Sequence, residues 1–176
     1  LALNALLKHT KNHNILAIFI FNPKQIYAKH NAYFSNNAVQ FMIESLRSLE
    51  KECHINYYEG NDLEILEGIA KKYKIKSIAF NKDYTPFAIK RDKDIADWCK
   101  KHCVTLITEE DYTLFPMGSI KNKSNMPYQV YTPFYKECMK KEKNISKPAK
   151  LAYPKINVIK TVSKFNKDKY YQLNTK

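Results

Sequence analysis

Glycine is scarce in this sequence, with 3 in 176 residues. The phosphate-binding loops of nucleotide-binding proteins need several glycines for close backbone approach, and neither GxxxxGK[ST] nor GxGxxG occurs. The 4 cysteines contain no CxxC pair and the 5 histidines are scattered. The sequence therefore predicts neither a glycine-rich phosphate cradle, nor a metal site, nor a disulfide framework.

Long apolar runs are also missing, and no signal peptide is recognisable. Hydrophobic residues make up 44% and aromatic residues 13%, enough for one packed domain plus a tail at this length. We expect a soluble, intracellular protein without a membrane partner. The first residue is Leu1, which indicates a processed, truncated or trimmed product.

The formal net charge of +13 is unevenly distributed. Residues 1–135 carry 18 Lys and Arg against 14 Asp and Glu, a balance of +4, whereas residues 136–176 carry 12 Lys against 3 acidic residues, a balance of +9. A lysine-rich tail can contact nucleic-acid phosphates, but a solvated linker has the same composition. The charge alone does not identify a DNA-binding surface.

Apolar runs alternate with amphipathic segments along the chain. Strands are predicted at 14–21, 55–58, 76–80 and 103–107, and helices at 1–11, 35–49, 61–73 and from about residue 90. This alternation indicates an α/β fold with a doubly wound, parallel sheet of the Rossmann-like type.

No strand precedes the first predicted helix, although such domains normally open with a strand near the middle of the sheet. We therefore expect a sheet ordered 3-2-1-4-5 whose opening strand is missing. Residues 1–139 form the predicted domain. Lys, Asn and Pro dominate residues 140–176, which are predicted to be an interdomain linker or tail.

Three segments together resemble the N-terminal domain of the photolyase/cryptochrome family. They are SNNAVQFMIESL at 35–46, NKDYTPFAIKRD at 81–92 and PYQVYTPFYK at 127–136, and LNAL at 3–6 is similar to the end of the family's opening signature. The resemblance covers residues 3 to 140. It implies the α/β half of a DNA photolyase, which holds an antenna chromophore.

In this family the catalytic half is a separate helical domain, which binds FAD and damaged DNA and splits pyrimidine dimers with light. No segment of this chain corresponds to it. The resemblance thus implies a FAD-binding helical half as partner, on the same gene or on a companion chain, and UV-damaged DNA only indirectly. The chain alone is expected to be inactive.

The resemblance also suggests the antenna site. Asp83 is the candidate polar contact to the chromophore ring, and Tyr84, Phe87 and Ala88 line its wall; Asp83 as a simple turn residue is the alternative. Asn81 and Arg91 are expected to fix the loop. Phe87-Ala88 stands where folate-binding members carry Asn-Glu, so a deazaflavin or flavin is favoured over folate.

Three alternatives remain open from the sequence. A cryptochrome-type blue-light sensor would share this domain, because the deciding residues lie in the other half. A non-enzymatic nucleotide-binding α/β module would need the glycine-rich loop that is missing. A basic nucleic-acid adaptor would need interleaved aromatic and basic residues, for which Tyr170-Tyr171 beside Lys169 is the one local hint.

Overall fold

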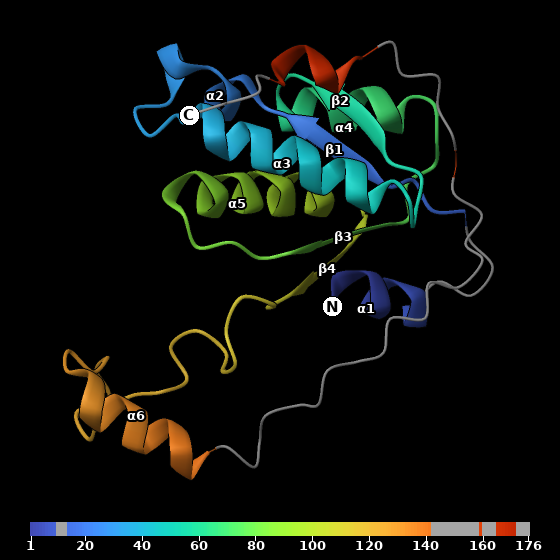
Figure 1. Cartoon of the computed structure of the whole chain (residues 1–176). Coiled ribbons are helices and arrows are strands. Elements are labelled where there is room, and N and C mark those ends of the chain that lie inside the picture. The colour runs from blue at the N-terminus through green and yellow to red at the C-terminus, as the bar shows by residue number, and fades with distance from the viewer. Residues whose placement is uncertain (10–13, 142–158, 160–164, 172–176) are drawn as a thin grey trace.

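The computed structural model describes residues 1–9, 14–141, 159 and 165–171, and its helices and strands alternate along the chain (Figure 1). The elements, in order, are α1 (Ala2–His9), β1 (Ile18–Phe21), α2 (Pro23–Ile26), a 3-10 turn (Ala28–His30), α3 (Asn36–Leu49), β2 (Asn56–Glu59), α4 (Asp62–Ala70), β3 (Ser77–Asn81), α5 (Pro86–Lys101), β4 (Thr105–Glu109), α6 (Tyr131–Lys140) and a second 3-10 turn, η3 (Lys167–Tyr170).

All strand pairs are parallel, as the sequence predicts. β1 pairs with β2, so that Phe21 lies opposite Glu59, and β3 pairs with β4, so that Asn81 lies opposite Glu109. The parallel α/β fold class is thereby confirmed. In the expected order the position between β1 and β3 belongs to the opening strand, and within the described ranges no strand occupies it. α1 packs against β3 and β4 instead.

Polar caps set the beginnings of α3, α4 and α5. The Ser35 hydroxyl accepts from Ala38 N at 3.4 Å, and the Asn61 side chain accepts from Leu63 N at 3.0 Å. Helix α5 begins four residues earlier than the sequence suggested. The reason is Thr85, whose hydroxyl caps the helix at Ala88 N, followed by Pro86 at the first helical position.

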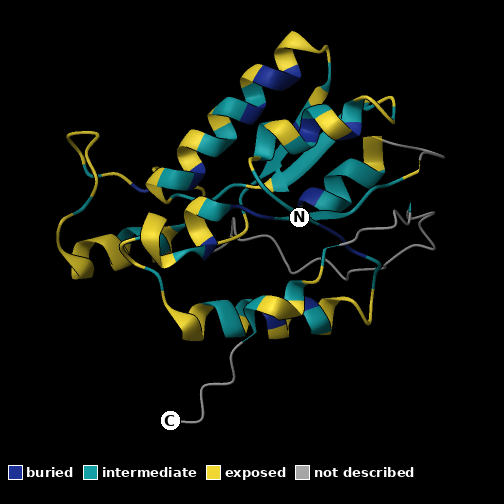
Figure 2. Cartoon of the chain, turned by 90° about the horizontal axis from the view of Figure 1, so that it is seen from above, coloured by how far each residue is buried: buried dark blue, intermediate teal, exposed yellow. Residues whose placement is uncertain are grey.

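The core consists of two apolar clusters, one for each strand pair. The first joins β1, β2 and α3 through Phe21, Ile26, Ile43, Leu46, Ile55 and Tyr57. The second joins α4 and α5 to β3 and β4 around Leu66, Ile95, Trp98 and Cys99. Figure 2 shows the strands mostly buried or intermediate, with exposed residues on the outer faces of the helices. Leu49, at the end of α3, is 40% exposed.

Helix α6 and the loop before it project away from the rest of the molecule (Figure 1). We call residues 112–139 the arm. It carries nine of the 14 exposed large hydrophobic side chains found in the described residues: Tyr112, Leu114, Met117, Met126, Val130, Tyr131, Phe134, Tyr135 and Met139. The arm is therefore an apolar surface without a partner inside the described part of this chain.

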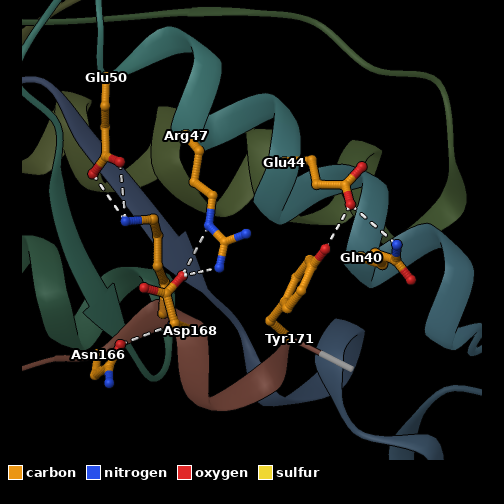
Figure 3. A network of polar contacts seen from close by, with 8 residues as sticks. Gln40, Glu44, Arg47, Glu50, Asn166, Asp168 and Tyr171 are labelled. Atoms are coloured by element: carbon orange, nitrogen blue, oxygen red, sulfur yellow. Dashed lines mark hydrogen bonds and ion pairs between the residues drawn. The ribbon is translucent and has the colours of Figure 1, made fainter. Parts of the chain in front are cut away.

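Residues 165–171, here named the clasp, return to the first core cluster. Phe165, Tyr170 and Tyr171 pack against that cluster. Ion pairs and hydrogen bonds to α3 surround these contacts (Figure 3): Arg47 with Asp168 at 3.0 Å, Lys167 with Glu50 at 3.0 Å, and the Tyr171 hydroxyl with Glu44 at 2.8 Å. The boundary at residue 139 stays a prediction, but this part of the expected tail packs against the domain.

The carboxylate of Glu59, at the end of β2, is the polar centre of the clasp. Its Oε1 accepts from the hydroxyls of Tyr27 and Tyr170, each at 2.6 Å, and Lys169 Nζ lies 2.7 Å from Oε2. Lys169 first, and then the two hydroxyls, lower the pKa of Glu59 to about 2. Burial and the bond to Glu59 raise the pKa of Tyr170 to about 12.

The substitution Glu59→Gln should lower the free energy of unfolding by about 1–3 kcal/mol at neutral pH, because two phenols and an ammonium lose a charged acceptor. The pKa of Glu59 is depressed in the folded state. The contribution of Glu59 to the free energy of unfolding is therefore present above pH 4.5 and is lost as the pH falls toward 2. Urea melts from pH 7 to pH 2 should therefore show a smaller loss of stability in the variant than in the wild type.

The matched control is Glu52→Gln, which removes an exposed carboxylate close to α3. It should leave both the stability and its pH dependence near the wild-type values. Parallel pH profiles for the wild type and Glu59→Gln would contradict the role assigned to Glu59.

Candidate functional site

The loops that follow the strands define two groups of polar side chains. One follows β1 and β2, and the other follows β3 and β4. Because the strands of each pair are parallel and end together, each group lies at the carboxyl edge of its pair. This edge is where α/β folds bind ligands. Within the described residues, no hydrogen bond or ion pair connects Asn22 or Tyr27 of the first group to Asp83 or Tyr84 of the second.

Asp83 lies in the turn between β3 and α5. Its Oδ1 accepts from the backbone N–H groups of Tyr84 at 2.6 Å and Thr85 at 3.1 Å, so the side chain shapes the turn that leads into the helix. Oδ2 receives no hydrogen bond from the described residues, and the side chain is half-buried. Asp83 is thus a turn residue with one carboxylate oxygen left for a ligand.

The Tyr84 hydroxyl is shielded from solvent and lies near the carboxylate of Glu110, but it makes no well-aligned hydrogen bond with any described residue. Burial, and secondly the carboxylate of Glu110, raise the pKa of Tyr84. A buried hydroxyl without a partner is unfavourable by about 1–3 kcal/mol, so such groups usually meet a water or a ligand. Tyr84 is the second group of the predicted set with capacity for a new polar contact.

The other two predicted residues differ in accessibility. Phe87 is half-buried in the first turn of α5, but Ala88 is 1% exposed. Ala88 packs beneath the helix start, and its N–H is already bonded to the Thr85 hydroxyl. Phe87 can therefore line a ligand wall as the structure stands, whereas Ala88 could do so only after a local rearrangement.

Acidic residues that follow β4, Glu110 and Asp111, hold this edge together. Lys82 Nζ lies 3.7 Å from Glu110, and Glu110 accepts from Met117 N at 3.0 Å. Asn81 donates to Asp111 at 3.2 Å and accepts from Ala2 N at 3.0 Å. These contacts tie the loops after β3 and β4 to each other and to α1.

The edge of β1 and β2 combines amide, carboxylate and aromatic groups that sequence reasoning missed. Asn22, 4% exposed, donates to Asp62 at 2.7 Å, and it accepts from Lys24 N at 3.0 Å. The ring of Phe21 stacks with that of Tyr170 at 5.8 Å between centroids. The pairing of Asn22 with Asp62 had one sequence signal, since Asn22 directly follows a predicted strand and Asp62 lies at the start of the helix predicted after the next strand.

A cavity of about 210 Å³ lies beside the clasp, near the start of β2. Its lining includes Glu50, His54, Tyr57, Phe165 and Lys167. The Nε2 atom of His54 is shielded from solvent and has no hydrogen-bond partner in the described residues. Pockets for drug-sized ligands measure about 300–1,000 Å³, so this cavity suits a few waters better than a ring system such as a flavin.

In the described ranges, no three His, Cys, Asp or Glu side chains come together as metal ligands. None of the described helices is both long enough and apolar enough to span a bilayer.

Comparison with known proteins shows which family has this arrangement. The sequence model of the DNA photolyase family matches residues 2–155. A deoxyribodipyrimidine photo-lyase of Buchnera aphidicola (subspecies Baizongia pistaciae) is 30% identical over 132 residues, which cover 72% of this chain and 28% of that protein. The same enzyme of Halobacterium salinarum is 24% identical over 139 residues, or 76% of this chain and 28% of that protein.

Solved structures give the same result. The archaeal photolyase from Sulfolobus tokodaii, crystallised with two FAD molecules, superimposes with a TM-score of 0.65 at 32% identity and covers 77% of this chain. A class III photolyase from Agrobacterium tumefaciens, at 20% identity and a TM-score of 0.63, shares the fold. The chain corresponds to 30% and 27% of these two proteins. The family match over residues 2–155 and these relatives together show that the chain belongs to the DNA photolyase family.

Proposed function

We propose that this chain is the light-harvesting half of a deoxyribodipyrimidine photolyase and binds an antenna chromophore at the carboxyl edge of its strands. A separate helical half carries FAD and repairs UV-damaged DNA. The observation that carries the proposal is the likeness to the Sulfolobus tokodaii photolyase, whose second FAD is described as a novel light-harvesting cofactor. The chain spans less than a third of that protein, and we assign the catalytic chemistry to the part of the photolyase that it does not span.

The carboxyl edge offers groups that fit an aromatic, hydrogen-bonding chromophore. Asp83 Oδ2 can accept from a ring N–H, and the shielded Tyr84 hydroxyl can donate to a ring carbonyl. Phe87 provides an aromatic wall. When bound, the chromophore absorbs light and passes its excitation energy to FAD. The chain's own residues orient the ring and shield it from water.

A flavin or a deazaflavin is the chromophore favoured by these residues. Both ring systems present an N–H and carbonyl oxygens at one edge, which match one carboxylate oxygen and one hydroxyl. Folate is disfavoured because Phe87-Ala88 replaces the Asn-Glu of folate-binding members, and Ala88 lies in the core. The phosphate groups of a dinucleotide would have to be bound by side chains rather than by backbone N–H groups, because the chain lacks a glycine-rich loop.

The arm has the properties of a docking surface for the helical half. Its exposed rings include Tyr131 and Tyr135, which stack at 5.9 Å between centroids on the outer face of α6, and Phe134. Aromatic residues grouped on one surface are typical of protein interfaces. We assign this surface to the FAD-binding half, because the matching relatives are three to four times longer than this chain's aligned part.

The substitution Asp83→Asn should weaken flavin binding at least about tenfold, because a charge-assisted hydrogen bond contributes about 1.5–3 kcal/mol. The Asn carbonyl still accepts from Tyr84 N and Thr85 N, so the turn and the melting temperature should be retained. The measurement is quenching of FMN, FAD and deazaflavin fluorescence on titration with the purified chain.

Asp97→Asn, on the exposed face of α5, is the matched control and should bind like the wild type. Equal affinity of Asp83→Asn and the wild type would remove Asp83 from the site. If none of the three compounds bound at micromolar concentrations, the antenna proposal would fail.

The double substitution Tyr131→Ser with Tyr135→Ser should weaken association with a FAD-binding helical half about tenfold or more, because clustered aromatic side chains dominate interface energies. The helical half of the Sulfolobus tokodaii photolyase, expressed separately, is a practical partner. Sedimentation of the mixture measures the association. This chain without the partner should give no light-dependent loss of dimers.

Tyr33→Ser with Phe41→Ser is the matched control, since these rings are 94% and 72% exposed outside the arm. The control should associate like the wild type. An equal loss of association in both double variants would show that the arm is not the docking surface. Repair of dimers by this chain alone would contradict the assignment of catalysis to the helical half.

A further inference from the structure

Six exposed lysines lie where α4 and α5 end and where β3 and β4 begin. We call them the lysine edge: Lys71, Lys72, Lys74, Lys76, Lys100 and Lys101. They belong to the amino edge of this strand pair, whereas Asp83 and Tyr84 belong to its carboxyl edge. The lysine edge is therefore distinct from the proposed chromophore site.

The packing of the second core cluster brings these lysines together. Ala70, Ile75 and Val104 pack against the buried cluster that contains Trp98 and Cys99. Ala70 directly precedes the stretch 71–76, Ile75 lies within it, and Val104 follows Lys101 after two intervening residues. In addition, the Lys76 carbonyl accepts from Thr105 N at 2.9 Å, which places the start of β3 beside the start of β4. Residues about 30 positions apart in the sequence thus share one edge.

The lysines on this edge form no direct ion pairs: none of the six lies within 4 Å of a carboxylate belonging to the described residues. The pKa of Glu67 is lowered chiefly by the hydrogen bond from Trp98 and also by the nearby charges of His102 and Lys101. The acidic neighbours are Glu67, which accepts from Trp98 Nε1 at 2.8 Å, and the exposed Asp97. By contrast, three of the four described tail lysines, 140, 167 and 169, pair with a glutamate, and Lys141 donates to the Ser119 carbonyl.

Favourable interaction with a helix dipole explains the positions of only some of the edge lysines. Lysines are favourable near helix carboxyl ends, which explains Lys71, Lys100 and Lys101. Lys74 and Lys76 lie beyond α4 in the connection to β3, where no helix dipole favours them. Exposed large hydrophobic side chains, which an anchor in a lipid surface would need, are missing from residues 71–76 and 100–105.

We propose that the lysine edge binds the phosphate backbone of duplex DNA. Lysine ammonium groups are point charges that contact phosphates well and do not read bases bidentately. Binding at this edge is therefore independent of sequence and of lesions. It increases the local concentration of DNA around the protein, whereas lesion recognition belongs to the partner half. This site goes beyond the antenna function and does not depend on it.

The test compares two quadruple variants with the same change in net charge. Lys71→Gln, Lys74→Gln, Lys76→Gln and Lys100→Gln remove the edge, and Lys24→Gln, Lys51→Gln, Lys121→Gln and Lys123→Gln remove exposed lysines elsewhere. Binding of the chain to a fluorescent 25-base-pair duplex is measured by anisotropy at several salt concentrations. Thermal melts verify that both variants are folded.

The edge variant should reduce the slope of log K against log salt by about 3 to 4, since each phosphate contact contributes about 0.9. Its affinity at low salt should fall at least tenfold, while the control variant keeps most of its affinity and slope. Duplexes with and without a thymine dimer should bind equally.

Three results would overturn the proposal. The first is an equal effect of both variants, which would mean that only net charge matters. The second is a dimer preference that disappears with the edge lysines. The third is tight binding of the chain to phosphatidylserine vesicles without measurable binding to DNA. Flavin binding, measured separately, should be the same in both variants. Failure of the DNA-binding proposal is therefore distinguishable from failure of the antenna proposal.

Discussion

Parallel strand pairing is the constraint on which the rest of this structure depends. A parallel pair needs a helical crossover, so the loops that leave the strands gather at one edge and those that enter them gather at the other. In β3 and β4 this separates Asp83 and Tyr84 from the lysines at 71–76 and 100–101. One small domain thereby presents a polar, partly shielded edge and a strongly basic edge without electrostatic conflict between them.

The sequence predicted the fold because its signals are local. Ser35 and Asn61 cap helices where expected, and the apolar runs that end at Phe21 and Phe80 became β1 and most of β3. The predicted start of α5 was four residues too late, because the prediction followed the apolar periodicity rather than the cap formed by Thr85 and Pro86. Family motifs, rather than periodicity, pointed to the loop that contains Asp83.

The candidate site was less predictable because its contacts join distant residues. Glu59 and Tyr170 are 111 positions apart, and a lysine-rich, weakly periodic tail carries no local sign that its rings return to the core. Similarly, the occupied Oδ1 of Asp83 and the burial of Ala88 depend on the turn geometry rather than on residue type. The three motifs identified the family, while the clasp and the lysine edge became visible only in three dimensions.

The central claim is that this chain harvests light for a FAD-bearing partner, and an action spectrum tests it most directly. The chain, loaded with its chromophore and combined with a helical half, is illuminated at narrow wavelengths, and dimer loss per incident photon is recorded. The account predicts an added maximum at the chromophore's absorption band that is lost with Asp83→Asn. A spectrum that follows FAD absorption alone, with or without this chain, would contradict it.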